Sequence, residues 1–463
     1  MSRRGRSVAA WILGVLCLFG AVGASDLDKD ELTAQTVRLL QRYLRIDTVN
    51  PPGNEWRAVD FFAEILAAEG IAFETVEAAP GRGNLWARLP GGDEPALLLL
   101  HHSDVVPADE RYWKHGPLSG ALDDGYVYGR GAIDTKGLGI LHLQAFLSLH
   151  RRGAPLRRDV LFMVTADEEA GGMAGAGFLV ETRPALFADV GYVLNEGGGG
   201  VLASGRPVFS VEVTQKVPLW LRVTASGEPG HGSSPRSSSA VGRLVGALAR
   251  LERHTFAPRA VPEVEAYFAG LAGAEGGELR ARFLDLGAAI DDAVFLRRLQ
   301  AESPRLHALL RNTCVVTRLG GSPKINVVPA EAWAEIDCRL LPDQDPDEFL
   351  HELRAVLADP GLGIEPLMAF APAISSPDTE LFRAIEETCR AHFPGAAVLP
   401  SVVAGFTDSH FFRDLGITAY GFSPTLFAED EATGIHGNNE RISVENLSRG
   451  VRVMIDLLER MAY

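Results

Sequence analysis

The chain has 463 residues, of which 46% are hydrophobic and 22% are charged, and its formal net charge is −16. Because a single hydrophobic core usually stops growing at ~250–300 residues, a chain of this length is expected to form two domains. The composition argues against an intrinsically disordered protein, and the acidic balance argues against nucleic acid or an anionic membrane as the partner.

The N-terminal residues form a separate pattern. Three arginines within the first six residues precede an apolar run from Val8 to Gly20, and small residues follow at 21–24. This order is typical of a cleaved secretory signal, and the run is too short to cross a bilayer comfortably. We expect residues 1–24 to be a signal peptide and the mature protein to be periplasmic or secreted. A retained membrane anchor is the alternative.

Strands and helices alternate in the first part of the mature chain. Apolar residues at three- and four-residue spacing predict helices at 56–68 and 138–149. Continuous apolar runs predict strands that are buried on both faces at Ala96–Leu100, Val160–Thr165 and Tyr192–Leu194. The alternation predicts an α/β fold with a mostly parallel sheet flanked by helices.

The pattern changes near Val211. The elements predicted beyond it are strands at 219–224, 314–319, 332–340 and near Met368, with helices at 241–253 and 347–358. Strand-helix-strand-strand-helix-strand is typical of a ferredoxin-like α+β domain with one open sheet face. A helix at 378–392, a strand at 417–422 and a terminal helix capped by Ser443 then resume the first pattern.

These patterns divide the chain. We expect residues 25–213 and 374–463 to form a catalytic domain, and residues 214–373 to form a smaller domain inserted into it. Residues 258–311 are expected to be a helical insertion within the smaller domain.

Three cysteines lie outside the expected signal peptide. Cys314, Cys338 and Cys389 show neither C-x-x-C spacing nor a disulfide-framework pattern. We expect each to be a buried free thiol. A Cys314–Cys338 disulfide is the alternative in an oxidising compartment, because both residues lie in predicted strands.

Histidine and acidic residues occur where five chain segments meet one edge of the predicted sheet. They are His102 and Asp104 after the first strand, Asp134 in the glycine-rich segment 129–137, Asp167, Glu168 and Glu169 after the second strand, Glu196 after the third, and His436 after the strand at 417–422. The carboxyl ends of parallel strands form one rim, where ligands bind. We therefore expect these side chains to lie together.

Without a cation, the carboxylates in such a group would repel one another and lose their hydration. Both types of side chain are ordinary zinc ligands, and two metal ions need a bridging carboxylate. The ions would lower the pKa of a shared water towards ~7, and a carboxylate that is not a ligand would take its proton. The adjacent Glu168 and Glu169 suit this division, with one as ligand and the other as base.

Other interpretations predict other patterns. A serine hydrolase would show a Gly-x-Ser-x-Gly elbow and a mononuclear zinc peptidase an H-E-x-x-H helix, and the sequence contains neither. A catalytically silent binding protein of this fold would be expected to lack the base or a ligand.

The sequence resembles the co-catalytic zinc peptidases that include aminoacylase-1, carboxypeptidase G, carboxypeptidase S and succinyl-diaminopimelate desuccinylase. The resemblance covers nearly all of the chain after residue 24. It rests on the segments 102–107, 129–137, 167–169, 196–198, 230–232, 326–329 and 436–437.

The resemblance implies two Zn²⁺ ions per subunit, with Co²⁺ or Mn²⁺ as substitutes. It implies that Asp134 bridges the ions, that His102 and Glu196 complete one site, and that Glu169 and His436 complete the other.

It also implies the catalytic roles. Glu168 would be the general base, Asp104 would fix the tautomer of His102, and a cis peptide bond would join Asp134 to Thr135. His231, from the inserted domain, would stabilise the oxyanion.

Substrate contacts are implied at Asn326, Gly405 and Thr407, and at Arg339, which would bind a terminal carboxylate. The segment 405–410 departs from the family, which commonly has Gly where Phe406 stands and Arg where His410 stands. The substrate is therefore open at this point.

We expect hydrolysis of an amide or peptide bond beside a free carboxylate, as in a carboxypeptidase or an N-acyl-amino-acid hydrolase. The helical insertion and the expected export favour a carboxypeptidase S-like or fatty-acyl-amino-acid type. An aminopeptidase or dipeptidase of the same fold is the alternative. The expected partners are a small peptide or N-acyl amino acid and a second copy of the chain, in a homodimer formed through the inserted domain.

Overall fold

The computed structural model describes residues 29–273, 276–428, 431 and 434–463. The predicted signal peptide lies outside the described residues. No helix among the described residues is both long enough and apolar enough to cross a membrane.

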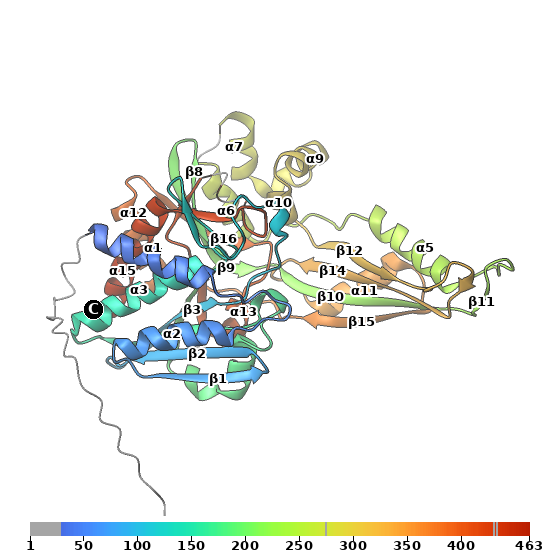
Figure 1. Cartoon of the computed structure of the whole chain (residues 1–463). Helices are drawn as coiled ribbons and strands as arrows, with labels where there is room; N and C mark the ends of the chain where they lie inside the picture. The colour runs from blue at the N-terminus through green and yellow to red at the C-terminus, as the bar shows by residue number, and fades with distance from the viewer. Residues whose placement is uncertain (1–28, 274–275, 429–430, 432–433) are drawn as a thin grey trace, which may run out of the picture.

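The larger sheet forms the centre of the body of the molecule (Figure 1). Its described strands, in spatial order, are β1 (Phe73–Ala79), β2 (Arg82–Leu89), β6 (Arg158–Thr165), β3 (Glu94–His102), β7 (Val190–Asn195), β17 (Thr418–Gly421), β9 (Arg206–Gln215), β8 (Gly199–Ala203) and β18 (Leu426–Phe427), and β16 (Ala397–Val403) pairs with β9. The four strands β6, β3, β7 and β17 run parallel to one another. The pairs β1–β2, β2–β6 and β8–β9 are antiparallel, and β18 runs parallel to β8 at the edge of the sheet.

Helices cover both faces of this sheet, as predicted. The helices on one face are α1 (Lys29–Leu44), α2 (Trp56–Ala68), α3 (Lys136–Arg152), α12 (Glu380–His392) and α15 (Val444–Ala462), and those on the other are α4 (Ala176–Thr182) and α13 (Ser409–Arg413). Along β3, Leu97 and Leu99 belong to the first core and Leu98 and Leu100 to the second, all fully buried. Each such burial is worth roughly 1.5–3 kcal/mol, which explains the continuous apolar run.

The helix ends follow from local sequence. Ser443 accepts a hydrogen bond from the backbone N–H of Asn446 and caps α15, as predicted. At the end of α3, Gly153 adopts the left-handed conformation that closes a helix without steric cost (φ 62°).

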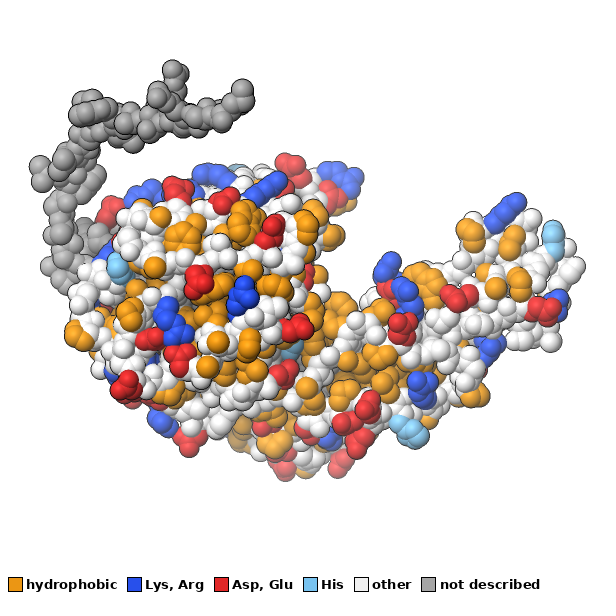
Figure 2. All heavy atoms as spheres, turned by 90° about the horizontal axis from the view of Figure 1, so that it is seen from below, with side chains coloured by type: hydrophobic (Ala, Val, Ile, Leu, Met, Phe, Trp, Pro, Cys, Tyr) orange, Lys and Arg blue, Asp and Glu red, His pale blue; other side chains and the backbone are white. Residues whose placement is uncertain are grey.

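The second sheet projects from the body with its two helices, and we call this part the arm (Figures 1 and 2). Its antiparallel strands, in spatial order, are β12 (Thr313–Gly320), β14 (Glu331–Leu340), β10 (Val217–Ser226) and β15 (Leu362–Ala369). Helices α5 (Ala240–Arg253) and α11 (Pro346–Leu357) pack on one face. Burial alternates along β10, as expected of a sheet with one open face. The far end of the arm carries β11 (Gly230–His231) paired with β13 (Val327–Val328).

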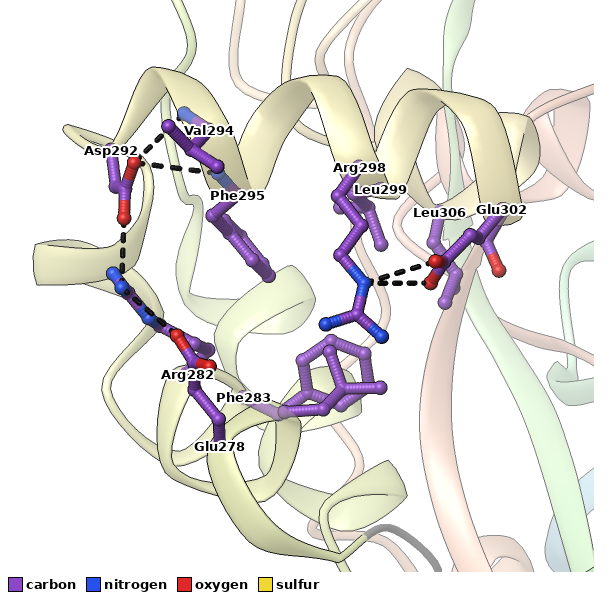
Figure 3. Close-up of a pocket in the computed structure, with 12 residues that line it drawn as sticks. Glu278, Arg282, Phe283, Asp292, Val294, Phe295, Arg298, Leu299, Glu302 and Leu306 are labelled. Atoms are coloured by element: carbon purple, nitrogen blue, oxygen red, sulfur yellow. Dashed lines mark hydrogen bonds and ion pairs between the residues drawn. The ribbon is translucent and has the colours of Figure 1, made fainter.

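The helical insertion packs against the body. Its helices are α6 (Pro262–Leu271), α7 (Gly277–Leu284), α8 (Leu286–Ala289), α9 (Ala293–Glu302) and α10 (Pro304–Ala308). Their apolar side chains form one cluster with Leu399 and Val402 of β16, a strand of the larger sheet. The pocket in Figure 3 lies between α7, α9 and α10, and Phe283 and Phe295 are among its lining residues. Two arginines of the pocket form ion pairs, Arg282 with Asp292 and Arg298 with Glu302.

The remaining elements are short. A small sheet contains β4 (Ala121–Asp123), β5 (Tyr126–Tyr128) and β19 (Arg441–Ser443), and 3₁₀ turns cover Glu110–Tyr112, Glu168–Ala170 and Pro184–Phe187.

The cysteines differ from the first expectation. Cys314 and Cys338 lie directly opposite each other on β12 and β14 and form a disulfide, with their Cα atoms 4.1 Å apart. The expectation of free thiols was therefore wrong for this pair, because two strands separated in sequence become neighbours only in the sheet. Cys389 is a buried free thiol within the described residues.

Candidate active site

The parallel strands carry the predicted chemical groups to one edge. His102 ends β3 and is paired in register with Thr165 at the end of β6. Glu168 and Glu169 follow β6 in a 3₁₀ turn, and Glu196 follows β7. Because the strand ends coincide, residues far apart in sequence lie within a few ångströms of one another.

Two groups of side chains in the described part of the chain could each hold a metal ion. One contains His102, Asp134 and Glu196, the other Asp134, Glu169 and His436, and in each the ligand atoms lie within 4.8 Å of one another. Asp134 belongs to both groups. Its Oδ1 lies 3.1 Å from Nε2 of His102, and its Oδ2 lies 3.1 Å from Nε2 of His436. A carboxylate with one oxygen towards each group suits a bridging position.

The segment that carries Asp134 is held by Glu440. This buried carboxylate accepts hydrogen bonds from the backbone N–H groups of Gly131, Ile133 and Asp134, and from the guanidinium of Arg130 at 2.7 Å. Burial raises the pKa of Glu440 and the charge of Arg130 opposes that rise. No sequence pattern indicated a role for Glu440 or Arg130, although Glu440 lies only four residues after His436.

Asp104 acts through both its backbone and its side chain. Its backbone carbonyl oxygen lies 3.0 Å from Nδ1 of His102, which directs Nε2 of that ring towards Asp134. Its carboxylate accepts hydrogen bonds from the N–H groups of Glu168 and Glu169, and from Asn50 at 2.7 Å. The carboxylate therefore holds the turn after β6, and the carbonyl is the closer contact to the imidazole. Asn50 is a further residue that the sequence analysis missed.

Glu168 lies beside the first group. It is buried, and its Oε2 is 3.9 Å from Nε2 of His102. Burial raises the pKa of Glu168 well above its ordinary value, and the charge of Glu196 adds to the rise. A carboxylate with a raised pKa is suited to accept a proton and release it again near neutral pH.

The electrostatics of the two groups fit a bound cation. Burial would lower the pKa of His102, but the neighbouring carboxylates, with Glu196 foremost, raise it well above its ordinary value. Hydrogen bonds to Asp134 and Glu169 raise the pKa of His436 to about 10. Burial raises the pKa of Glu169 to about 7, although His436 opposes the rise.

Two causes produce these shifts: burial raises the pKa of Glu169, and the packing of several carboxylates around two imidazoles raises the pKa of both histidines. Oε1 of Glu169 is also buried and has no hydrogen-bond partner among the described residues. A divalent cation in each group would neutralise the carboxylates and supply that missing partner. Imidazole and carboxylate donors fit Zn²⁺. The peptide bond between Asp134 and Thr135 is cis, as expected.

The residues predicted to contact the substrate or the oxyanion lie in three places. Thr407 lies beside the loop that carries Glu196, since a methyl carbon placed on Gly197 would be 3.5 Å from Cγ2 of Thr407, and Gly405 is an exposed residue two positions earlier. Arg339 lies on the open face of the arm sheet near the body. His231 and Asn326 are exposed at the far end of the arm, so the structure does not bring them to the metal groups (Figure 1).

His410 does not replace the charge of the family's arginine. Its ring stacks on Phe370 with the centroids 3.6 Å apart, and burial lowers its pKa. The imidazole is therefore neutral at physiological pH and packs as an aromatic ring. Arg339 remains as a cation near the segment 405–410, because its guanidinium lies 5.4 Å from the ring centroid of Phe406.

Comparisons with known proteins agree with this architecture. The chain is 33% identical over 455 residues to the N-fatty-acyl-amino acid synthase/hydrolase PM20D1 of Xenopus tropicalis, covering 92% of this chain and 85% of that protein. It is 29% identical over 438 residues to human aminoacylase-1, covering 92% and 95%.

Solved structures share the fold. An M20 family metallo-carboxypeptidase from Sulfolobus solfataricus superposes with a TM-score of 0.73 at 20% identity, covering 92% of this chain and 99% of that one. Human carnosine dipeptidase 1 superposes with a TM-score of 0.66 at 18% identity, covering 94% and 98%. Residues 98–460 match the model of peptidase family M20/M25/M40. The protein is therefore a metallopeptidase-type hydrolase that belongs to peptidase family M20/M25/M40.

Proposed function

We propose that this protein hydrolyses N-acyl amino acids with the aid of two Zn²⁺ ions. The observation that carries the proposal is Asp134, whose two carboxylate oxygens each lie 3.1 Å from a different histidine, with Glu168 close by. Relatives at 33% and 29% identity are an N-fatty-acyl-amino acid synthase/hydrolase and an aminoacylase, which favours an acyl group on the substrate nitrogen.

The proposed chemistry divides the work among named residues. Two bound Zn²⁺ ions would supply a polarised water and charge neutralisation at the scissile carbonyl. Glu168 takes a proton from the attacking water and delivers it to the leaving nitrogen, because it is buried beside His102 and its pKa is raised. Asp104 holds the backbone N–H groups of Glu168 and Glu169 and so keeps base and ligand in fixed positions.

Arg339 is proposed to bind the substrate carboxylate. The carboxylate of Asp337 accepts hydrogen bonds from Nε of Arg339 at 2.7 Å and from one of its terminal nitrogens, Nη2, at 3.1 Å. The other terminal nitrogen, Nη1, is buried without a hydrogen-bond partner in the described part of the chain. Leaving a buried donor unsatisfied costs ~1–3 kcal/mol, and a substrate carboxylate would provide the acceptor.

The test combines metal analysis with a substrate panel. We expect two Zn²⁺ per chain and hydrolysis of N-acyl amino acids, with Glu168→Ala reducing kcat at least 10²-fold while the metal content stays at two. Undiminished hydrolysis by the variant would overturn the role of Glu168. Cleavage of dipeptides in preference to every N-acyl amino acid would instead identify a carboxypeptidase or dipeptidase.

His231 is proposed to act in the site of a second copy of the chain. It is exposed at the far end of the arm, and exposed apolar side chains lie on α5 (Val245) and on the edge strand β12 (Val315 and Leu319). A homodimer formed through the arms would cover these side chains and could carry His231 to the neighbouring site.

Mixing two variants of low activity tests this arrangement. His231→Ala and Glu168→Ala are each expected to lose most of the activity. After mixing under conditions that exchange subunits, mixed dimers contain one site with both residues intact, so a substantial part of the activity should return. No recovery in verified mixed dimers would show that His231 does not act across the dimer.

We also propose that residues 1–24 are a cleaved signal and that the mature protein is exported. The Cys314–Cys338 disulfide supports this, because structural disulfides persist mainly in oxidising compartments. N-terminal sequencing of the protein recovered from the periplasm or medium should begin near residue 25. A protein that retains its first residues in the membrane fraction would contradict cleavage.

A further inference from the structure

An aromatic cluster lies where the arm meets the body. Trp220 on β10 and Phe406 in the loop after β16 have ring centroids 6.3 Å apart, and the guanidinium of Arg339 lies within 6 Å of both rings, at 5.9 Å and 5.4 Å. Phe370 supports Phe406 edge-on at 5.8 Å. Such contacts fix the position of an arginine and surround it with apolar walls.

The same cluster extends across the arm sheet. Trp220 pairs in register with Met368 on β15 and with Asp337 on β14, so these three side chains form one row on the open face. Asp337 accepts a hydrogen bond from the indole N–H of Trp220 at 3.0 Å and also binds Arg339. Trp220, Met368 and Phe406 remain only half-buried and are therefore available to a ligand.

The cluster borders two of the loops that carry metal-group residues. Thr407, which follows Phe406, lies against Gly197, the neighbour of Glu196. A methyl carbon placed on Gly171, two residues after Glu169, would be 3.0 Å from Sδ of Met368. Apolar walls, a cation and the metal groups therefore meet at one place.

We propose that Phe406, Trp220 and Met368 form the pocket for the side chain of the residue that carries the substrate carboxylate, and that this side chain is bulky and apolar, as in phenylalanine or leucine. In an amino acid the side chain and the carboxylate share one carbon atom. A carboxylate bound to Arg339 therefore brings the side chain against the two rings that lie beside the guanidinium. Small or acidic side chains would leave these walls uncovered or place a charge against them.

This inference rests on the proposed function in one respect, the binding of the carboxylate by Arg339. It adds the substrate class, and it assigns a purpose to Phe406, where the family commonly has glycine. The glycine would remove one wall of the pocket together with its contacts to Trp220 and Arg339.

Binding of free amino acids to the metal-loaded protein tests the pocket independently of turnover. Calorimetry should show that L-phenylalanine binds at least ~10-fold more tightly than L-alanine. Phe406→Gly and, separately, Met368→Ala should each reduce this ratio severalfold, mainly by weakening the binding of L-phenylalanine. The two substitutions lie on different elements. If the Phe406→Gly variant fails to fold, the Met368→Ala variant therefore still tests the pocket.

Trp333→Ala is the matched control. Trp333 lies on the same open face as Arg339, and its ring also contacts arginines, Arg222 and Arg318. It should leave the preference for L-phenylalanine unchanged. Equal binding of both amino acids by the wild-type protein, or an unchanged ratio in both pocket variants, would overturn the proposal.

The experiment distinguishes failure of the proposed pocket from failure of the proposed reaction. A protein that binds L-phenylalanine selectively but does not hydrolyse N-acetyl-L-phenylalanine retains the pocket and refutes the reaction. A protein that hydrolyses N-acetyl-L-alanine and N-acetyl-L-phenylalanine equally retains the reaction and refutes the pocket.

Discussion

Both the body and the arm are expected to contribute residues to the site. The residues of the two parts are held in place to different degrees. On the body, His102, Asp134 and Glu196 lie within 4.8 Å of one another, anchored by strand ends and by buried hydrogen bonds. On the arm, His231 lies on a two-residue strand at the exposed far end. Residues anchored in a close-packed sheet are preorganised, whereas those on an arm depend on what the arm contacts.

The largest expected difference between body and arm is in the effect of substituting two histidines, His436 and His231. His436→Ala should lower the metal content from two ions to one and reduce kcat/KM by at least ~10³-fold, because the ring contacts both Asp134 and Glu169. His231→Ala should reduce the rate but leave two ions bound. Zinc analysis of both purified variants checks this, and loss of an ion from the His231 variant would refute the division between body and arm.

Glu440→Gln probes how far the preorganisation of the body depends on a residue outside the metal groups. The amide would lose the charge that balances Arg130 and would have only one acceptor oxygen for the three backbone N–H groups. We expect metal affinity to fall roughly 10–100-fold. Titration against a zinc chelator measures the change. Unaltered affinity would mean that the Asp134 segment keeps its position without this support.

Removal of the disulfide tests the stability of the arm separately from that of the body. The Cys314→Ser/Cys338→Ser double variant should destabilise the pairing of β12 with β14 by ~2–4 kcal/mol, because the crosslink closes a loop between residues 24 positions apart. Hydrogen exchange in β12 should accelerate, while the metal content stays at two ions. Equal acceleration in β3 would contradict the separation of arm and body.

Lys216 lies where the chain passes from the body into the arm, and its effect is on the pH dependence of stability. Burial lowers its pKa to about 7, with a further contribution from the charge of Arg339, whereas a lysine in an unfolded chain has a pKa of ~10.4. Between these values the unfolded chain binds the extra proton, so this residue makes stability rise as the pH increases from about 7 to about 10.

Lys216→Met should remove this contribution. The slope of the unfolding free energy against pH should then fall by up to ~1.4 kcal/mol per pH unit within that window. Urea unfolding at a series of pH values compares the two proteins. Parallel curves would show that Lys216 is protonated in the folded state throughout.

Much of the fold could be predicted because the local patterns are strong. The run at Ala96–Leu100 became the centre of β3, and the alternation at Leu219–Thr224 became part of β10. The packing of the helical insertion on β16 could not be predicted, since apolar helix faces do not indicate which surface they cover. The Cys314–Cys338 bond was left as an alternative for a similar reason, because register between distant strands is a tertiary property.

The sequence by itself determined which carboxylates and imidazoles would gather at one edge of the sheet. The residues after each buried strand are given by order along the chain, and parallel strands bring their carboxyl ends to one edge whatever the details of packing. Only the tertiary structure decided which atoms meet: that Asp134 directs one oxygen to each of two histidines, that Glu440 holds its segment, and that Arg339 lies beside both Trp220 and Phe406. These contacts join residues distant in sequence, and their geometry depends on how sheets, helices and arm pack together.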